Sequence, residues 1–152
     1  FSMRILAISI VLLLTTVSPW EEGEWKPKQF RDMEIRVVIK CQIPHSSKFP
    51  FDITLIEANR GRSAIFNPDR EVAKKVKAKF LDVIYLKGMM EPEIDQVLEP
   101  YLLISHKCNM NNQLVEGCHT LPKNDGWTDV FPPPYFNDAG TINVDELEPC
   151  PA

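Results

Sequence analysis

The side chains with the clearest chemistry in this sequence are four cysteines. They all follow the N-terminal apolar segment. An even number of cysteines in an oxidising compartment indicates disulfide bonds, but spacing alone does not choose among the possible pairings. Structural zinc is the alternative, although its sites use closely paired ligands and the nearest two cysteines here are separated by nine residues. The four are Cys41, Cys108, Cys118 and Cys150.

The histidines do not suggest catalysis or metal binding. His45, His106 and His119 lack the H-E-x-x-H spacing of a metal site. On an alternating strand His106 shares a face with Leu102 and Ile104, so we interpret it as a partly buried structural histidine rather than a functional one. Neither a G-x-S-x-G motif nor a glycine-rich phosphate loop occurs among the six glycines. The sequence therefore predicts no enzyme activity, no metal and no cofactor.

The N-terminus predicts secretion. Met3 and Arg4 precede a largely apolar run of ten residues over 5–14, which is typical of a signal peptide and too short for a membrane span of ~20 residues. We expect a signal peptide over residues 1–18 and an extended lead-in over 19–33, with no transmembrane segment. The net charge of −4 does not favour nucleic acid as a partner, because no basic stripe is present to neutralise phosphates.

The remaining chain alternates apolar and polar residues in short runs, as half-buried strands do. We expect a domain over residues 34–148, followed by a tail over 149–152. Its expected fold is mainly β, an antiparallel β-sandwich of about seven strands with one short helix. The predicted strands cover residues 34–41, 51–58, 63–66, 80–86, 101–108, 118–121 and 140–144.

The helix is predicted over residues 67–79. Asn67 and Pro68 suit an N-cap and a first helical position, and Val72, Val76 and Phe80 follow at four-residue spacing. The lysines of this segment are a candidate contact for anionic head groups, although such a cluster is more often a solvated face. They are Lys74, Lys75, Lys77 and Lys79.

A proline-rich segment over residues 126–134 offers a second candidate contact. Trp127 and Phe131 lie in it and Tyr135 follows it directly, so the three could form an apolar contact. An alternative function follows from the same segment, namely a secreted inhibitor or host-interaction effector that presents a proline-stiffened loop to a protease or receptor. Rigid prolines would reduce the entropy lost on binding.

Three segments together resemble the nematode transthyretin-like family of secreted proteins. Residues 35–41 look like its first strand, which ends in a cysteine, and residues 137–144 look like its closing strand. The stretch Pro-Tyr-Leu-Leu-Ile-Ser-His-Lys-Cys, residues 100–108, is similar to the family's Pro-Tyr-Leu-x-Ile-Tyr-His-x-Cys. The sequence departs from the family at Ser105, where tyrosine is usual, and at Asn137, where an aromatic residue is usual.

The resemblance implies a transthyretin-like sandwich and a disulfide between Cys41 and Cys108, which leaves Cys118 to Cys150. It also implies an extracellular binding or recognition role, with a lipid head group, a small apolar ligand or a cell-surface protein as the candidate partner. Relatives of transthyretin include hydroxyisourate hydrolases, but their terminal Tyr-Arg-Gly-Ser is absent at the end of this sequence. We therefore expect a binding protein rather than an enzyme.

Overall fold

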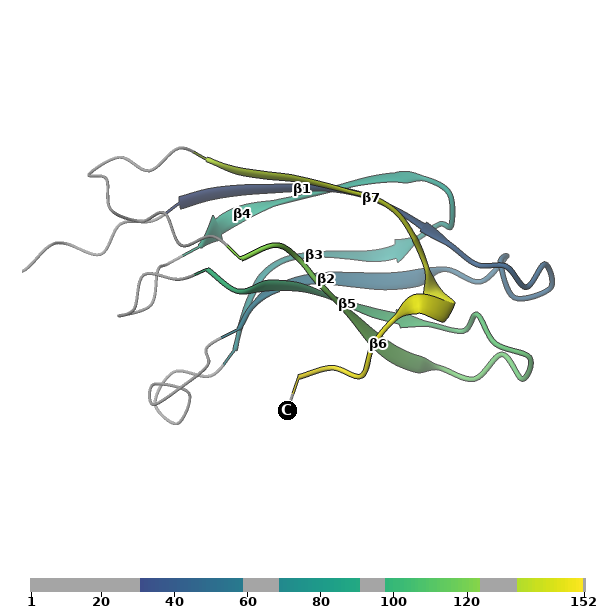
Figure 1. Cartoon of the computed structure of the whole chain (residues 1–152). Coiled ribbons are helices and arrows are strands. Elements are labelled where there is room, and N and C mark those ends of the chain that lie inside the picture. The colour runs from purple at the N-terminus through teal and green to yellow at the C-terminus, as the bar shows by residue number, and fades with distance from the viewer. Residues whose placement is uncertain (1–30, 59–68, 91–97, 124–133, 152) are drawn as a thin grey trace, which may run out of the picture.

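The computed structural model describes residues 31–58, 69–90, 98–123 and 134–151. In these residues two β-sheets pack face to face, so the predicted β-sandwich is confirmed (Figure 1). One sheet has the strand order β4-β1-β7 and the other the order β3-β2-β5-β6. The strands are β1 (Arg31–Lys40), β2 (Phe51–Glu57), β3 (Arg70–Ala78), β4 (Val83–Met90), β5 (Pro100–His106), β6 (Val115–Thr120) and β7 (Tyr135–Asn143).

The core lies between the sheets and is built by alternation along the strands. In β1 every second side chain is buried while its neighbours face outward. The inward side chains of β1 meet those of β2 and β5 across the sandwich, which removes their apolar surface from water. The fully buried members include Ile35, Val37, Ile39, Ile53, Leu55, Leu102 and Ile104.

One strand pair departs from the expected antiparallel arrangement. β7 runs parallel to β1, whereas every other strand pairing in the described residues is antiparallel. The β1–β7 register shifts between Arg36 and Val38, where β7 contains an irregularity at Gly140 with a φ of 65°. Glycine adopts this left-handed conformation without steric cost.

The predicted helix over residues 67–79 is wrong, because Arg70–Ala78 forms strand β3 at a sheet edge. Four-residue spacing places Val72 and Val76 on one helical face, but it also places them at alternate positions of a strand. Pairing with β2 decides between the two, since it satisfies the backbone groups of both strands. Lysines on an edge strand also discourage pairing with other chains. The only helical element in the described residues is a 3₁₀ turn, η1 (Val144–Glu146), and none of their helices could cross a membrane.

Several strand boundaries differ from the prediction. β1 begins at Arg31, inside the predicted lead-in, and β4 begins at Val83 and continues to Met90. The predicted start of β4 at Phe80 is wrong because Phe80 and Leu81 form a turn, with Leu81 at a φ of 70°. β6 and β7 also begin earlier than predicted. The predicted signal peptide and the predicted strand at 63–66 lie outside the described residues.

Two disulfides tie the sheets and the C-terminal tail together. Cys41–Cys108 connects the ends of β1 and β5, which lie in different sheets, and Cys118–Cys150 connects β6 to the tail. These are the pairings that the resemblance implied. The tail also contacts β6 through Glu148, whose backbone exchanges hydrogen bonds of 2.8 and 2.9 Å with that of Cys118. The edge of β6 is therefore partly covered by the chain's own tail (Figure 1).

Candidate binding surface

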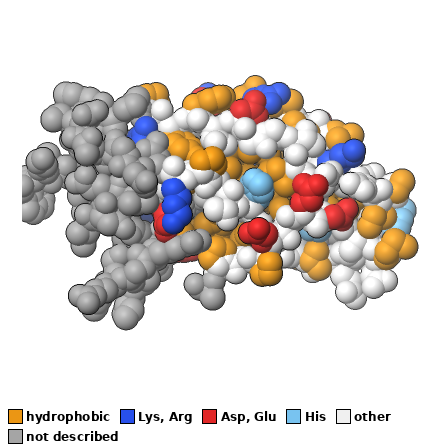
Figure 2. Space-filling model, viewed as in Figure 1, with side chains coloured by type: hydrophobic (Ala, Val, Ile, Leu, Met, Phe, Trp, Pro, Cys, Tyr) orange, Lys and Arg blue, Asp and Glu red, His pale blue; other side chains and the backbone are white. Residues whose placement is uncertain are grey.

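The outer face of the β4-β1-β7 sheet combines exposed hydrophobic side chains with charged ones. We call this surface the outer face, and it consists of the outward side chains of the three strands. Figure 2 shows orange hydrophobic side chains beside red and blue charged ones along the upper margin, where Figure 1 places this sheet. Its exposed large hydrophobic residues are Val83 (47%), Tyr85 (53%), Met89 (55%) and Phe136 (60%).

Strand register brings these residues into rows with charged neighbours. Tyr85 of β4 lies opposite Arg36 of β1, which lies opposite Asp138 of β7. The Arg36 guanidinium donates to both Asp138 carboxylate oxygens, at 3.1 and 3.0 Å. Hydrogen bonds to Tyr85 and to Asp138 raise the pKa of Arg36. The pKa of the Asp138 carboxyl is lowered, first by the backbone N–H of Gly140 and then by Arg36.

A second row pairs Lys87 of β4 with Glu34 of β1, 3.2 Å apart, and Phe136 of β7 lies beside Glu34. The charges of the outer face balance, with three acidic and three basic side chains. They are Asp32, Glu34, Asp138, Arg36, Lys40 and Lys87. Exposed ion pairs of this kind contribute little stability, so their main effect is to set the local charge pattern.

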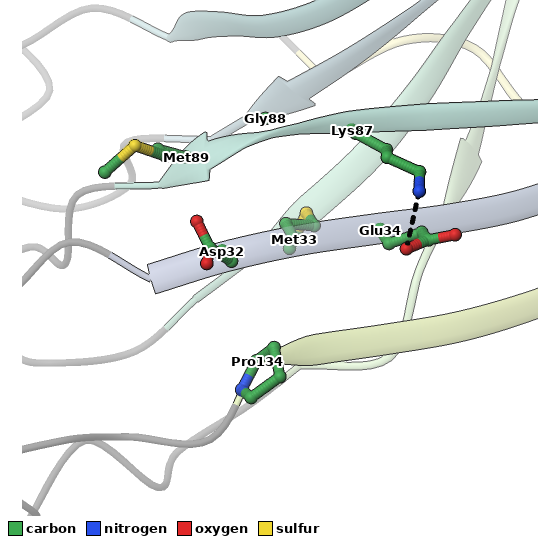
Figure 3. A pocket seen from close by; sticks show the side chains of 7 residues that line it. All are labelled: Asp32, Met33, Glu34, Lys87, Gly88, Met89 and Pro134. Carbon is green, nitrogen blue, oxygen red and sulfur yellow. Dashed lines mark ion pairs between the residues drawn. The ribbon is translucent and has the colours of Figure 1, made fainter.

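A cavity of about 450 Å³ opens at one end of the outer face (Figure 3). It lies where β1 begins and β4 ends, and it is lined by Met89 of β4, Asp32 of β1 and Pro134, which directly precedes β7. Its volume lies within the roughly 300–1,000 Å³ of small-molecule pockets. The described residues that line it are Asp32, Met33, Glu34, Lys87, Gly88, Met89 and Pro134.

Polar contacts from the other sheet hold this end of β4 in place. Arg70 of β3 donates to the backbone oxygen of Met89 at 2.9 Å and to the Glu57 carboxylate of β2 at 3.4 Å. Glu57 is buried, so this partner compensates part of the cost of removing its charge from water. Nearby, the Tyr101 hydroxyl donates to Asp69 at 2.8 Å. The cavity rim at Met89 is thus fixed by an arginine that spans the two sheets.

The lysines predicted as a contact are all exposed, but they do not share the outer face. Lys74, Lys75 and Lys77 lie on the edge strand β3, and Lys79 follows it. Lys75 is opposite the buried Ile53 and Lys74 is opposite Thr54, so these two neighbours point to opposite sides of the sheet. The lysine charges of β3 are therefore distributed over both sides of the sheet and do not form one cluster.

The other predicted contact residues divide into two groups. Trp127 and Phe131 lie outside the described residues. Tyr135 is buried, with its hydroxyl donating to the backbone oxygen of Pro122 at 2.8 Å and the Arg31 guanidinium 5.9 Å from its ring centroid. His106 is also buried. Among the described residues, no cluster of His, Cys, Asp or Glu could hold a metal ion.

Sequence reasoning did not find the outer face. Residues 83–86 are all apolar, so their alternation does not reveal which side chains face the core and which face water. Phe136 lies directly before the segment of residues 137–144 that resembles the closing strand, and no alternating pattern around it predicts that it faces water. Pairing with β1 identifies which side chains of β4 face outward. Val37 and the opposite Ile84 form a core pair, whereas Arg36 and the opposite Tyr85 form an outward pair.

No protein-family model matches this sequence, and none of the curated proteins matches it either. Among solved structures, the chain is similar to the crystal structure of a 9R-lipoxygenase from Cyanothece PCC8801, with 14% sequence identity and a TM-score of 0.37. That alignment covers 76% of this chain but only 16% of the lipoxygenase chain. A similarity at this level carries no argument about fold or function.

Proposed function

We propose that this protein is a secreted, disulfide-bonded recognition protein of the transthyretin-like type, which binds a partner protein through its outer face. The observation that carries the proposal is the gathering of four exposed large hydrophobic residues on one sheet surface. Exposed large apolar side chains that share one face with charged ones are a feature of interaction sites. Tyrosine, phenylalanine and methionine are also the side chains enriched at protein interfaces.

The charge pattern of the outer face favours a protein over a membrane or a nucleic acid. Its acidic and basic side chains are equal in number, so it has no net attraction for a surface of one sign. Glu34 already forms an ion pair with Lys87, and Arg36 forms one with Asp138. These pairs lie between the hydrophobic residues of β4 and that of β7, so a partner that covers the outer face would need polar groups opposite them.

The extracellular part of the proposal is supported by the predicted signal peptide and by the two disulfides. The transthyretin-like part is supported by the two-layer fold and by the Cys41–Cys108 bond, which the resemblance implies. Expression with the chain's own N-terminal segment tests secretion. The protein should accumulate in the medium with both bonds formed, and retention inside the cell would contradict the proposal.

The recognition function is tested by capture of partners from extracellular fluid on the immobilised protein. The Tyr85→Ser/Phe136→Ser variant should lose a partner that the unchanged protein retains, because aromatic anchors contribute about 2 kcal/mol or more each at interface centres. Val76→Ser is a matched control, because Val76 is similarly exposed but lies on β3. Equal retention by the double variant and the control would contradict a role for the outer face.

A further inference from the structure

The cavity of the outer face places one carboxylate between two apolar side chains. Strand register sets Asp32 of β1 opposite Met89 of β4, and Pro134 lines the same cavity from the position directly before β7. Figure 3 shows Asp32 on β1 between Met89 and Pro134. Asp32 and Met89 are both exposed. A group that enters the cavity therefore meets a negative charge with apolar surface on either side of it.

The Asp32 carboxylate has no ion pair or side-chain hydrogen bond with another described residue. The other two charged side chains of the lining, Glu34 and Lys87, pair with each other at 3.2 Å. The described lining therefore has a formal charge of −1, carried by a side chain that the fold leaves available. Charge complementarity favours a cationic guest.

The wider surroundings of the cavity have the same sign. At this end of the sandwich the described residues include six acidic and four basic side chains, a net charge of −2. The segments connected to this end that lie outside the described residues, 19–30, 59–68, 91–97 and 124–133, contain eight acidic and four basic residues by sequence. The count of described residues covers 31–34, 57–58, 69–71, 87–90, 98–101, 121–123 and 134–136.

The basic side chains nearest the cavity do not occupy it. Lys87 is held by its ion pair on β1, and Arg70 donates to the Glu57 carboxylate and to a backbone oxygen of β4. Arg31 is buried, and its guanidinium lies 5.9 Å from the centroid of the Tyr135 ring. Because side chains alternate along β1, Arg31 points to the opposite side of the sheet from Asp32. The positive partner of Asp32 therefore has to come from outside the molecule.

An arginine side chain suits both parts of the cavity. Its planar guanidinium can donate two hydrogen bonds to one carboxylate, and its methylene groups can lie along apolar surface such as Met89 and Pro134. A lysine ammonium is more strongly hydrated and lacks the paired geometry. A metal ion is disfavoured, because no group of His, Cys, Asp or Glu among the described residues could hold one. Arginine is also enriched at the centres of protein interfaces.

We propose that the cavity is a specificity pocket that receives an arginine side chain of the partner protein, with Asp32 as its paired carboxylate. The origin of the arginine in a partner rests on the proposed function of the outer face, whereas the preference of the pocket for this side chain can be measured without a partner. Tyr85 and Phe136 then supply apolar contact on the same face, and the pocket selects which partners fit.

Acetyl-arginine-amide is a probe for the pocket alone. When it is titrated into isotope-labelled protein, the backbone amide resonances of Asp32 and Met89 should shift saturably. The dissociation constant should be on the order of 1–10 mM, because so small a ligand makes few contacts. The uncharged isostere acetyl-citrulline-amide should shift these resonances far less, and acetyl-lysine-amide should bind several-fold more weakly. No saturable shift at these amides, or equal binding of either analogue, would overturn the proposal.

Matched variants locate the binding. Asp32→Asn should weaken the binding of acetyl-arginine-amide by at least about five-fold, because the charge opposite the guanidinium is lost. Asp82→Asn removes the same charge from the turn before β4, at the other end of that strand, and should leave binding unchanged. All substituted side chains here and in the next pair are exposed, so the melting temperature should stay the same. Equal loss in both aspartate variants would overturn the role of Asp32.

The apolar wall has its own matched pair. Met89→Ser should weaken the binding of acetyl-arginine-amide several-fold, because the methylene groups lose an apolar neighbour. Met110→Ser changes a methionine in the loop after β5, which is 74% exposed, and should have no effect. Unchanged binding by Met89→Ser would overturn the placement of the arginine in this cavity.

The pocket and the proposed function can fail separately. The Tyr85→Ser/Phe136→Ser variant should still bind acetyl-arginine-amide, and Asp32→Asn should reduce capture of a partner that Asp82→Asn retains. Capture that depends on Tyr85 and Phe136 but not on Asp32 would overturn the inference and leave the proposed function in place. Binding of acetyl-arginine-amide without any capture through the outer face would support the pocket and contradict the proposed function.

Discussion

At the scale of single residues, His106 couples the fold to pH. It is buried next to the Cys41–Cys108 bond, and its Nδ1 accepts the backbone N–H of Cys108 at 3.1 Å. Burial lowers the pKa of His106 below its ordinary 6.5, and the nearby Asp145 charge opposes this only in part. The accepting Nδ1 and the lowered pKa both favour the neutral imidazole in the folded protein.

The sign of the resulting pH dependence follows from linkage. As the pH falls through 6.5, the unfolded chain binds a proton at His106 that the folded protein resists, so the free energy of unfolding should decrease. The decrease should level off once the pH is below the folded-state pKa. Urea unfolding from about pH 7.5 to about pH 5 measures this effect.

His106→Asn is the appropriate comparison, because its side-chain oxygen can still accept the Cys108 N–H. This variant should show a flatter dependence of unfolding free energy on pH between the same limits. The other two histidines remain in both proteins and cancel in the comparison. Parallel pH curves for the two proteins would show that His106 does not contribute.

At the scale of elements, the contact between β3 and β4 closes one side of the sandwich. Gly88 of β4 lies so near β3 that an added Cβ would be 2.6 Å from the Val72 side chain and 2.7 Å from its backbone oxygen. The same end of β4 is held by Arg70 and forms the rim of the cavity. The close packing of Gly88 on β3 therefore stabilises the fold and also positions the cavity rim of the outer face.

Gly88→Ala should lower the free energy of unfolding by about 1–3 kcal/mol, the usual cost of overpacking. The double variant Gly88→Ala/Val72→Ala should recover only part of this loss, because the backbone oxygen of Val72 stays in place. Gly140→Ala is a useful contrast, since its Cβ would meet no atom within 4 Å but its φ of 65° costs about 1 kcal/mol. Urea titration measures all three, and full recovery in the double variant would contradict the backbone clash.

At the scale of the whole molecule, the two disulfides have different tasks. Cys41–Cys108 closes a sequence separation of 67 and joins the two sheets, whereas Cys118–Cys150 closes a separation of 32 and holds only the tail. The tail contacts β6 at Gly117, where a Cβ would lie 2.6 Å from the Leu147 side chain, and at Cys118. Removal of the Cys41–Cys108 bond and removal of the Cys118–Cys150 bond should therefore open different parts of the structure.

The Cys41→Ala/Cys108→Ala variant should lose about 4 kcal/mol of unfolding free energy and become less protected throughout both sheets. The Cys118→Ala/Cys150→Ala variant should lose hydrogen-exchange protection first at the backbone amides of positions 118 and 148, while the amides of β1 stay protected. Hydrogen exchange with mass spectrometry measures both patterns. Tail opening that spreads immediately to β1 would contradict the local role of the second bond.

The outer-face cavity and the Cys41–Cys108 bond lie at opposite ends of β1. The outer face is formed by one sheet, and its cavity lies where β1 begins. The Cys41–Cys108 bond lies at the opposite end of β1, directly after Lys40. Substitutions on the outer face near the cavity are therefore expected to leave the Cys41–Cys108 bond unchanged.

Local pattern was sufficient for much of the fold. Alternation in residues 34–41, 51–58 and 101–108 predicted strands, because a sheet with one buried face requires side chains of period two. All three are strands within a few residues of the predicted limits. Local pattern was ambiguous for β3, since a four-residue spacing fits a helix and a strand equally.

The sequence by itself determined the class of fold and the presence of enough cysteines for two bonds. Only the tertiary structure decided that residues 70–78 are an edge strand, that Tyr85 and Phe136 share an outer face, and that Leu81 and Met110 project from one end. The physical reason is that a sequence pattern records which side chains prefer burial, whereas strand pairing over long separations decides which of the others become neighbours.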